Sequence, residues 1–125
     1  MLDHISFPCS NLDRTIGFYD AVLGALGYRR LWTTQRAAGW GTTGVDERFA
    51  VKLQVEAVPP GSGFHLAFTA PAREAVRVFH QRALAQGGRD NGAPGLRPAY
   101  GPDYFAAFVY DPDGHAVEAV CHSPS

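Results

Sequence analysis

The sequence contains few cysteines and no long apolar run, and both shortages exclude classes of protein. Its 125 residues include only 2 cysteines and 1 methionine. Two cysteines are too few for the disulfide framework of a small secreted domain. Cys9 and Cys121 each end a strand-like run, so we expect two buried thiols rather than a redox pair. Because the longest apolar stretches fall far short of about 20 residues, no membrane span is expected.

The chain also has almost no excess of charge of either sign. Charged residues make up 18% of the chain, and the formal net charge is -1. This balance excludes a broad electrostatic footprint for nucleic acid or for an anionic membrane, and it favours a small-molecule partner. The opening Met-Leu-Asp-His has no basic segment followed by an apolar run, so we expect no secretory signal and a cytoplasmic protein.

Apolar residues are plentiful and are arranged in a repeat. They make up 46% of the chain, which at this length suits one folded domain over residues 1–125. When the sequence is shifted by 61 residues, apolar, histidine and glycine positions coincide. The matched pairs are His4/His65, Phe7/Phe68, Asp13/Glu74, Phe18/Phe79, Leu23/Leu84 and Gly27/Gly88. We interpret this as a duplication with module 1 at residues 1–58 and module 2 at residues 64–122.

Each module is predicted to have the order βαβββ, which makes the fold class α+β. A capping box at Ser10 and Asp13 predicts the first helix start, and Pro71 suits the first turn of the second helix. The turn at 111–114, Asp-Pro-Asp-Gly, predicts a hairpin. The expected strands cover residues 3–8, 28–34, 39–43, 49–56, 64–69, a short piece near 89, 103–110 and 115–121.

Strand alternation predicts that two histidines and one glutamate point away from the large apolar side chains of their strands. His65 points away from Phe64, Leu66 and Phe68, and His4 points away from Ile5 and Phe7. Glu118 lies in the middle of an apolar strand, where a buried carboxylate needs a partner or a metal.

If the modules are related by a pseudo-twofold axis, His4 and His65 converge near that axis and Glu118 can join them. Two imidazoles and one carboxylate suit Zn²⁺, Ni²⁺, Mn²⁺ or Fe²⁺. A lone strand histidine is more often structural and a lone strand glutamate more often faces solvent. Their occurrence together at matched positions favours the metal. The remaining histidines are interpreted as non-ligands: His80 on a helix surface, His115 structural and His122 solvated.

Several motifs resemble the vicinal oxygen chelate superfamily, which contains glyoxalase I, fosfomycin-resistance thiol transferases, bleomycin-resistance proteins and extradiol dioxygenases. They are the opening Leu-Asp-His-Ile-Ser-Phe, the segments Asn-Leu-Asp-Arg-Thr-Ile-Gly-Phe-Tyr and Val-Leu-Gly-Ala-Leu-Gly-Tyr, Gly-Phe-His-Leu-Ala-Phe at 63–68, and the closing hairpin at 110–120. The resemblance implies a cupped mixed sheet with helices on its outer face. It also implies one divalent ion on His4, His65 and Glu118, with Glu118 as a catalytic residue.

The same resemblance implies a function and an assembly. The implied function is a metal-dependent lyase or isomerase of the glyoxalase (lactoylglutathione lyase) type that stabilises an enolate or alkoxide. The alternatives are a metal-dependent thiol transferase or extradiol-type dioxygenase, and a non-catalytic protein that binds a small molecule such as an antibiotic. Chains of this length in the superfamily usually form homodimers whose sites are lined by both chains.

A fourth ligand and the substrate contacts stay open at this point. The tetrapeptide Val-Glu-Ala-Val at 55–58 recurs at 117–120, which nominates Glu56 as a fourth ligand or base. Since Pro59 and Pro60 follow closely, a solvent-facing loop position is favoured for it. Tyr100 and Tyr104 are the predicted substrate contacts, with Trp40 and Arg97 as weaker candidates.

Overall fold

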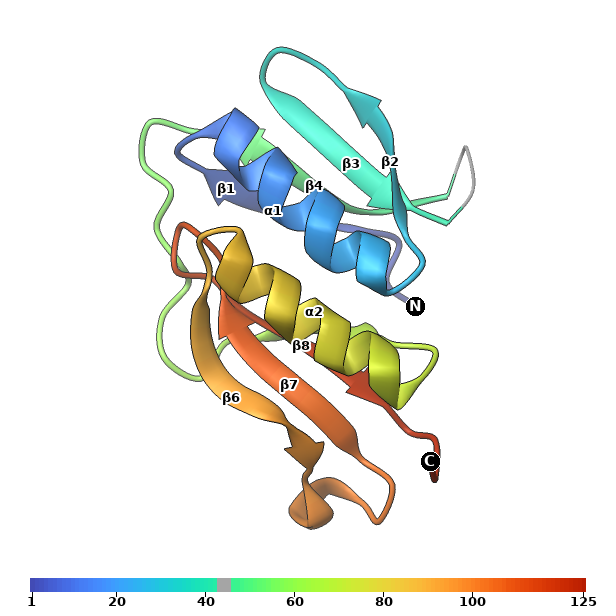
Figure 1. The fold of residues 1–125 in the computed structure, drawn as a ribbon. Helices are drawn as coiled ribbons and strands as arrows, with labels where there is room; N and C mark the ends of the chain where they lie inside the picture. The colour runs from blue at the N-terminus through green and yellow to red at the C-terminus, as the bar shows by residue number, and fades with distance from the viewer. Residues whose placement is uncertain (43–45) are drawn as a thin grey trace.

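Two βαβββ modules follow one another along the chain, as the repeat predicts (Figure 1). The computed structural model describes residues 1–42 and 46–125. Module 1 contains β1 (Ile5–Cys9), α1 (Leu12–Ala25), β2 (Arg29–Thr33), β3 (Ala37–Gly41) and β4 (Glu47–Leu53). Module 2 contains β5 (Leu66–Thr69), α2 (Arg73–Ala85), β6 (Arg89–Leu96), the 3-10 turn η1 (Pro98–Tyr100), β7 (Phe105–Tyr110) and β8 (Ala116–Cys121). The α+β prediction is confirmed; position 43, the last of one predicted strand, lies outside the described residues.

Each module forms its own four-stranded mixed sheet with the same topology. The strand orders are β1-β4-β3-β2 and β5-β8-β7-β6. The first strand of each module runs parallel to the last, and the other pairs are antiparallel. In the part of the chain that is described, β1 and β5 therefore each pair on one side only, at the edge of their sheets.

The helices and one face of each sheet enclose a core that runs through both modules. In Figure 1, α1 (blue) and α2 (gold) lie next to each other, and Arg82 of α2 donates a hydrogen bond of 3.0 Å to the backbone oxygen of Ala21 in α1. Aromatic rings join the modules, with Phe49 and Phe68 5.4 Å apart between ring centroids. The large, fully buried side chains from both modules include Trp40, Tyr19, Phe18, Phe79, Leu23, Val51, Val76 and Val109.

The helix starts differ from the predicted ones by one or two residues. Asn11, and not Ser10, caps α1, because its side chain accepts a hydrogen bond of 3.0 Å from the backbone N–H of Arg14. Helix α2 begins at Arg73, so Pro71 precedes the cap and the prediction of a first-turn proline is wrong. Neither helix in the described part of the chain is long and apolar enough to cross a membrane.

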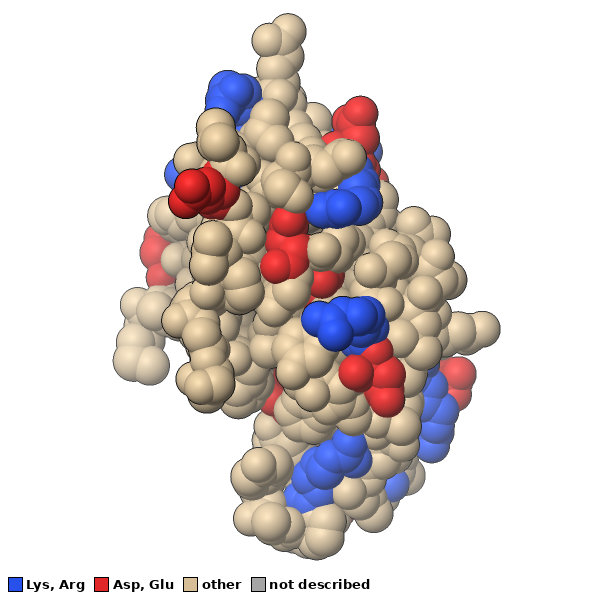
Figure 2. Space-filling model, turned by 90° about the vertical axis from the view of Figure 1, so that its left-hand side faces the viewer, with Lys and Arg blue, Asp and Glu red and all other residues tan. Residues whose placement is uncertain are grey.

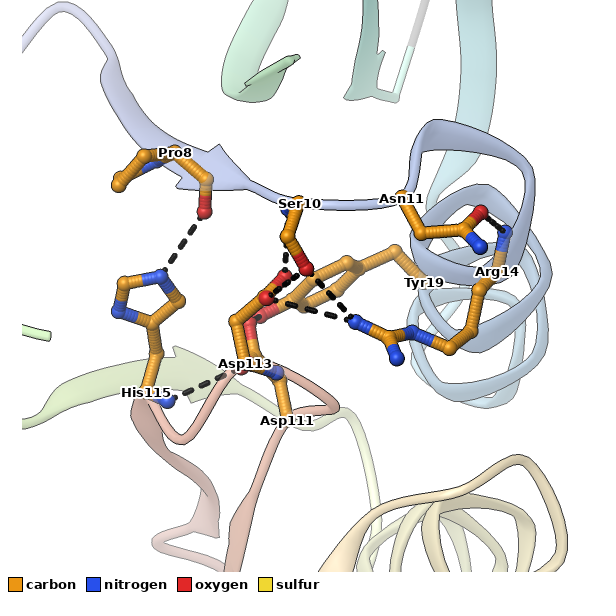
Figure 3. Close-up of polar contacts among 8 residues, drawn as sticks. All are labelled: Pro8, Ser10, Asn11, Arg14, Tyr19, Asp111, Asp113 and His115. Carbon is orange, nitrogen blue, oxygen red and sulfur yellow. Dashed lines mark hydrogen bonds and ion pairs between the residues drawn. The ribbon is translucent and has the colours of Figure 1, made fainter. Parts of the chain in front are cut away.

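Ser10 instead belongs to a group of polar residues that joins the two modules (Figure 3). This intermodule polar cluster consists of Ser10, Arg14 and Tyr19 from module 1 with Asp111, Asp113 and His115 from module 2. The Ser10 hydroxyl donates to Asp113 at 2.5 Å and the Tyr19 hydroxyl donates to Asp111 at 2.7 Å. The His115 ring Nε2 lies 2.9 Å from the backbone oxygen of Pro8, as Figure 3 also shows. The predicted hairpin turn at 111–114 is thus also a contact between modules.

Candidate metal centre

Glu118 lies at the centre of β8, on the sheet face directed away from the helices. Its neighbours across the sheet are Ala67 on β5 and Phe108 on β7. The adjacent residues Val117 and Ala119 point into the core, as the alternation predicts. Glu118 is nevertheless fully buried, with 0% of its surface exposed. A carboxylate in this setting requires polar partners.

Tyr104 supplies one of those partners. Its hydroxyl donates a hydrogen bond of 2.5 Å to Oε2 of Glu118. Burial, together with this bond and the negative charge, raises the pKa of Tyr104 to about 12. The phenol therefore stays protonated at neutral pH and holds one carboxylate oxygen in place.

His65 approaches the other oxygen of the same carboxylate. Its Nε2 lies 2.9 Å from Oε1 of Glu118. The two atoms are not aligned as a hydrogen bond, and among the described residues Oε1 has no hydrogen-bond donor although it is buried. Two donors on one divalent ion lie about 2.8–3.6 Å apart, since each bond is about 2.0–2.2 Å long and the angle between neighbouring bonds is about 90–110°. An imidazole nitrogen at this distance from the carboxylate oxygen forms an ion pair when the ring is protonated, and the same arrangement also suits two ligands of one metal ion.

A groove of about 580 Å³ adjoins His65 on this face. It is lined in part by the aromatic rings of Phe64, Tyr100, Phe108 and Tyr110. Tyr100 is 69% exposed and packs edge-on against Tyr104, with ring centroids 5.2 Å apart. The structure thus places both predicted substrate contacts, Tyr100 and Tyr104, next to the His65–Glu118 pair, and their role as contacts stays a prediction.

His4 is not brought to this pair within the chain. It lines a separate, smaller cavity of about 170 Å³ with Asp3, Arg48 and Phe49, among others. No group of three His, Cys, Asp or Glu side chains lies close enough to hold an ion within residues 1–42 and 46–125. The His4 Nδ1 lies 2.7 Å from Oδ1 of Asp3, and this contact lowers the pKa of Asp3. A carboxylate on one ring nitrogen is the usual support of a metal-binding histidine.

The position of His4 nevertheless matches that of His65. Each histidine immediately precedes the edge strand of its module, β1 in one case and β5 in the other. Each also points away from the core, since Ile5 and Leu66 beside them pack on it. His4 and His65 are 52% and 51% exposed at their side chains, so both can reach a ligand that comes from outside the chain.

The sheet registers decide the question of Glu56. Glu118 pairs across the sheet with Ala67, and Ala67 corresponds to Ser6 in the repeat. Ser6 pairs with Ala50, so Ala50 and not Glu56 occupies the position equivalent to Glu118. Strand β4 ends at Leu53, and Glu56 lies beyond it in an exposed loop. The echoed tetrapeptide is therefore not a structural equivalence, and the favoured loop position of Glu56 is confirmed.

Trp40, a weaker candidate for a substrate contact, does not lie on the face of its sheet that is directed away from the core. Trp40 is 1% exposed, lies in the core and donates a hydrogen bond of 2.9 Å to Asp20. Trp32 instead lies on the His4 face of its sheet, across from Gly39, and donates a hydrogen bond of 2.7 Å to Glu47. The sequence did contain a signal for Trp32. The residue lies in a predicted strand, and the next predicted strand carries a glycine, which leaves room for a large ring beside it.

The structure places the cysteines and the remaining histidines as predicted. Cys9 and Cys121 are free and buried, as predicted. His115 is structural and fully buried, and His80 lies on α2, with its ring 2.8 Å from Asp90. His122 is exposed, and its ring packs edge-on against Tyr104 at 5.1 Å. Arg97 lies over Phe108, with its guanidinium carbon 5.3 Å from the ring centroid. Figure 2 shows acidic and basic side chains interspersed on the face that it views.

Comparison with known proteins agrees with the paired βαβββ modules. The sequence profile of the Glyoxalase/Bleomycin resistance protein/Dioxygenase superfamily matches residues 1–119. No curated protein matches the chain in a sequence search. A glyoxalase/bleomycin resistance protein from Albidiferax ferrireducens T118 is similar in structure, with 26% identity, a TM-score of 0.84 and coverage of 97% of this chain and 98% of that one.

Two further structures share the fold at lower identity. The fosfomycin resistance protein FosX from Listeria monocytogenes has 17% identity and a TM-score of 0.72, with coverage of 99% of this chain and 94% of that one. A glyoxalase I variant from Zea mays has 19% identity and a TM-score of 0.75, and the match covers 95% of this chain and 46% of that one.

The chain belongs to the Glyoxalase/Bleomycin resistance protein/Dioxygenase superfamily. That superfamily includes metal-dependent enzymes, and its members typically bind a divalent ion.

Proposed function

We propose that this protein is a divalent-metal-dependent enzyme whose ion is held by His65 and Glu118 of one copy and His4 of a second copy. The observation that carries the proposal is the buried Oε1 of Glu118, which has no hydrogen-bond donor among the described residues and lies 2.9 Å from the His65 nitrogen. His4 is supported as the third ligand by its matched position in the repeat and by Asp3 behind its ring. Two edge strands, each paired on one side, offer the surfaces on which a homodimer could form.

In this site the residues have separate tasks. A bound Zn²⁺, Ni²⁺, Mn²⁺ or Fe²⁺ would supply Lewis-acid chemistry, stabilising negative charge that develops on adjacent oxygens of a small substrate. Glu118 supplies a ligand oxygen that needs no reorganisation, because Tyr104 already fixes the other oxygen. The aromatic groove beside His65 excludes water from one side of the substrate and orients it.

The type of reaction is also part of the proposal. A lyase or isomerase of the glyoxalase type is one candidate, and it needs a base to move a proton between substrate carbons. Ala50 stands at the module 1 position equivalent to Glu118, so no carboxylate is available there. This observation favours the second candidate, a metal-dependent thiol transferase or extradiol-type dioxygenase, neither of which requires that carboxylate.

Metal binding is the first test of the proposal. Purified protein is freed of metal, and its affinity for Zn²⁺, Ni²⁺ and Mn²⁺ is measured by titration calorimetry alongside thermal unfolding. The wild type should bind about one ion per chain and unfold at a higher temperature when loaded. His65→Ala and Glu118→Ala should lose most of that affinity. His122→Ala, which removes an exposed histidine just beyond the end of β8, should not. Equal affinity in all four proteins would contradict the site, and absence of binding in the wild type would favour a non-catalytic binding protein.

The reaction is then tested on the loaded protein with three substrates. A hemithioacetal tests the glyoxalase-type reaction, an epoxide with a thiol tests transfer, and a catechol with oxygen consumption tests oxygenation. We expect turnover of the epoxide or the catechol to exceed that of the hemithioacetal. Turnover of the hemithioacetal alone would contradict the inference drawn from Ala50.

A further inference from the structure

Trp32 forms a flat platform on the His4 face of module 1. The residue lies on β2 across from Gly39 of β3. A Cβ atom at Gly39 would clash with Nε1, Cε2 and Cζ2 of the indole, so one face of the ring lies directly on the glycine backbone. The ring is half-buried, and its N–H donates to Oε1 of Glu47 at 2.7 Å. The glycine and the hydrogen bond together fix the position and the tilt of the indole.

A row of small residues connects this platform to the histidine end of the sheet. Across the four strands the row runs Ser6, Ala50, Gly39, Trp32. His4 lies on the same face, two residues before Ser6. None of the three small residues carries a side chain longer than a hydroxymethyl group, so this row forms a floor that has no bulky side chain of its own.

The span of this floor limits what it can accept. Gly39, which the indole covers, is two strands from β1, a distance of about 10 Å at the usual strand spacing. A group bound by its oxygens beside His4 would therefore need a flat extension of about two fused rings to lie on the indole. Module 2 offers matching aromatic surface, because Phe108 stands beside Glu118 and Tyr100 lines the same groove.

We propose that Trp32 is the specificity-determining residue of the site, and that the substrate carries a planar, conjugated group that stacks on the free face of its indole. The inference rests on the proposed function, because there His4 of one copy binds the same ion as His65 and Glu118 of a second copy. Aromatic stacking on a fixed ring contributes affinity that a puckered group of similar size does not receive.

Two ligands with the same metal-binding head test this directly. Loaded with Zn²⁺, the protein is titrated with 2-naphthohydroxamate and with decahydronaphthalene-2-carbohydroxamate, whose adjacent oxygens and number of fused rings are identical but whose tails are flat and puckered. The wild type should bind the naphthyl compound at least about 10-fold more tightly, which is about 1.4 kcal/mol. Trp32→Ala should remove this preference and leave the decahydronaphthyl compound within about threefold of its wild-type affinity. Trp32→Phe should keep part of the preference.

The control is Thr33→Ala, on the same strand but on its opposite face. It should keep the full preference, and thermal unfolding should show that every variant is folded. If the wild type binds metal and both hydroxamates equally, or if Trp32→Ala weakens both alike, the role of Trp32 is overturned and the proposed function stands. If the wild type binds metal but neither hydroxamate, the role of Trp32 is likewise overturned. If it binds no metal at all, both proposals are overturned.

Discussion

The two oxygens of Glu118 have different surroundings, and this difference defines the site at the scale of single residues. Oε2 accepts a short hydrogen bond from Tyr104, whereas Oε1 is buried and has no hydrogen-bond donor in the described part of the chain. A lone buried acceptor of this kind costs about 1–3 kcal/mol, more when it is charged. A cation bound at Oε1 and His65, as we propose, would remove that cost.

Tyr104→Phe tests the role of the phenol. The change removes the donor to Oε2 and frees the carboxylate to rotate, so the affinity for Zn²⁺ should fall about 10- to 100-fold, as it does when other supporting hydrogen bonds to metal ligands are removed. Calorimetric titration measures the loss. Tyr100→Phe, in the neighbouring ring without a bond to Glu118, serves as the control. An unchanged affinity in Tyr104→Phe would show that the phenol does not position Glu118.

Residue roles were only partly predictable from sequence. Strand alternation predicted that His4, His65 and Glu118 point away from the core, because alternation depends on the backbone alone. It did not distinguish Trp32 from Trp40, because that choice depends on which strand lies beside which. Tyr104 was predicted to lie near the site. Its hydrogen bond to Glu118 could not be predicted, because it depends on the conformation of the turn that follows η1.

At the scale of elements, the register between neighbouring strands carries the information that the sequence lacks. Element order, turns and strand faces were predicted well from periodicity and from Gly and Pro positions. The equivalence of Glu56 and Glu118 was inferred from four repeated letters, whereas the registers pair Ser6 with Ala50 and Ala67 with Glu118. Because β4 ends at Leu53, the repeated tetrapeptide does not occupy equivalent strand positions in the two modules.

Gly39→Ala tests the packing of β2 on β3. The added methyl group would displace the Trp32 ring and weaken its bond to Glu47, so the free energy of unfolding should fall by about 1–3 kcal/mol. Backbone strain does not contribute, because Gly39 is not among the glycines with positive φ. Urea denaturation of Trp32→Ala, Gly39→Ala and the double variant measures the coupling. In the double variant the cost of the alanine should largely disappear; strictly additive losses would contradict the packing.

At the scale of the whole molecule, the helices and the intermodule polar cluster fix the two modules against each other. Asp111 is buried and accepts the Tyr19 hydroxyl as well as the backbone N–H groups of Asp113 and His115. Burial raises the pKa of the Asp111 carboxyl, and burial likewise raises the pKa of Tyr19 well above its usual value near 10.

Tyr19→Phe tests the cluster through the pH dependence of stability. A raised pKa in the folded state gives stability that is fully present below pH 10 and is lost as the pH rises above it, because the unfolded chain releases the proton first. Wild-type stability, measured by urea denaturation, should therefore fall between about pH 10 and 11 more steeply than that of Tyr19→Phe. At pH 7 the variant should be less stable by about 1–2 kcal/mol, since Asp111 loses a donor. Parallel curves for the two proteins would contradict a buried, un-ionised Tyr19.

The shared metal site is tested most directly by mixing two defective chains. His4→Ala and His65→Ala should each bind Zn²⁺ weakly alone, because every site in either homodimer lacks one ligand. In a mixed dimer, His4 of one chain meets His65 and Glu118 of the other, and one of the two sites is complete. Co-expressed and randomly paired, the two variants should recover tight binding at about one quarter of the wild-type number of sites. Mixed dimers that recover no tight site would contradict a centre built from His4, His65 and Glu118 of two copies.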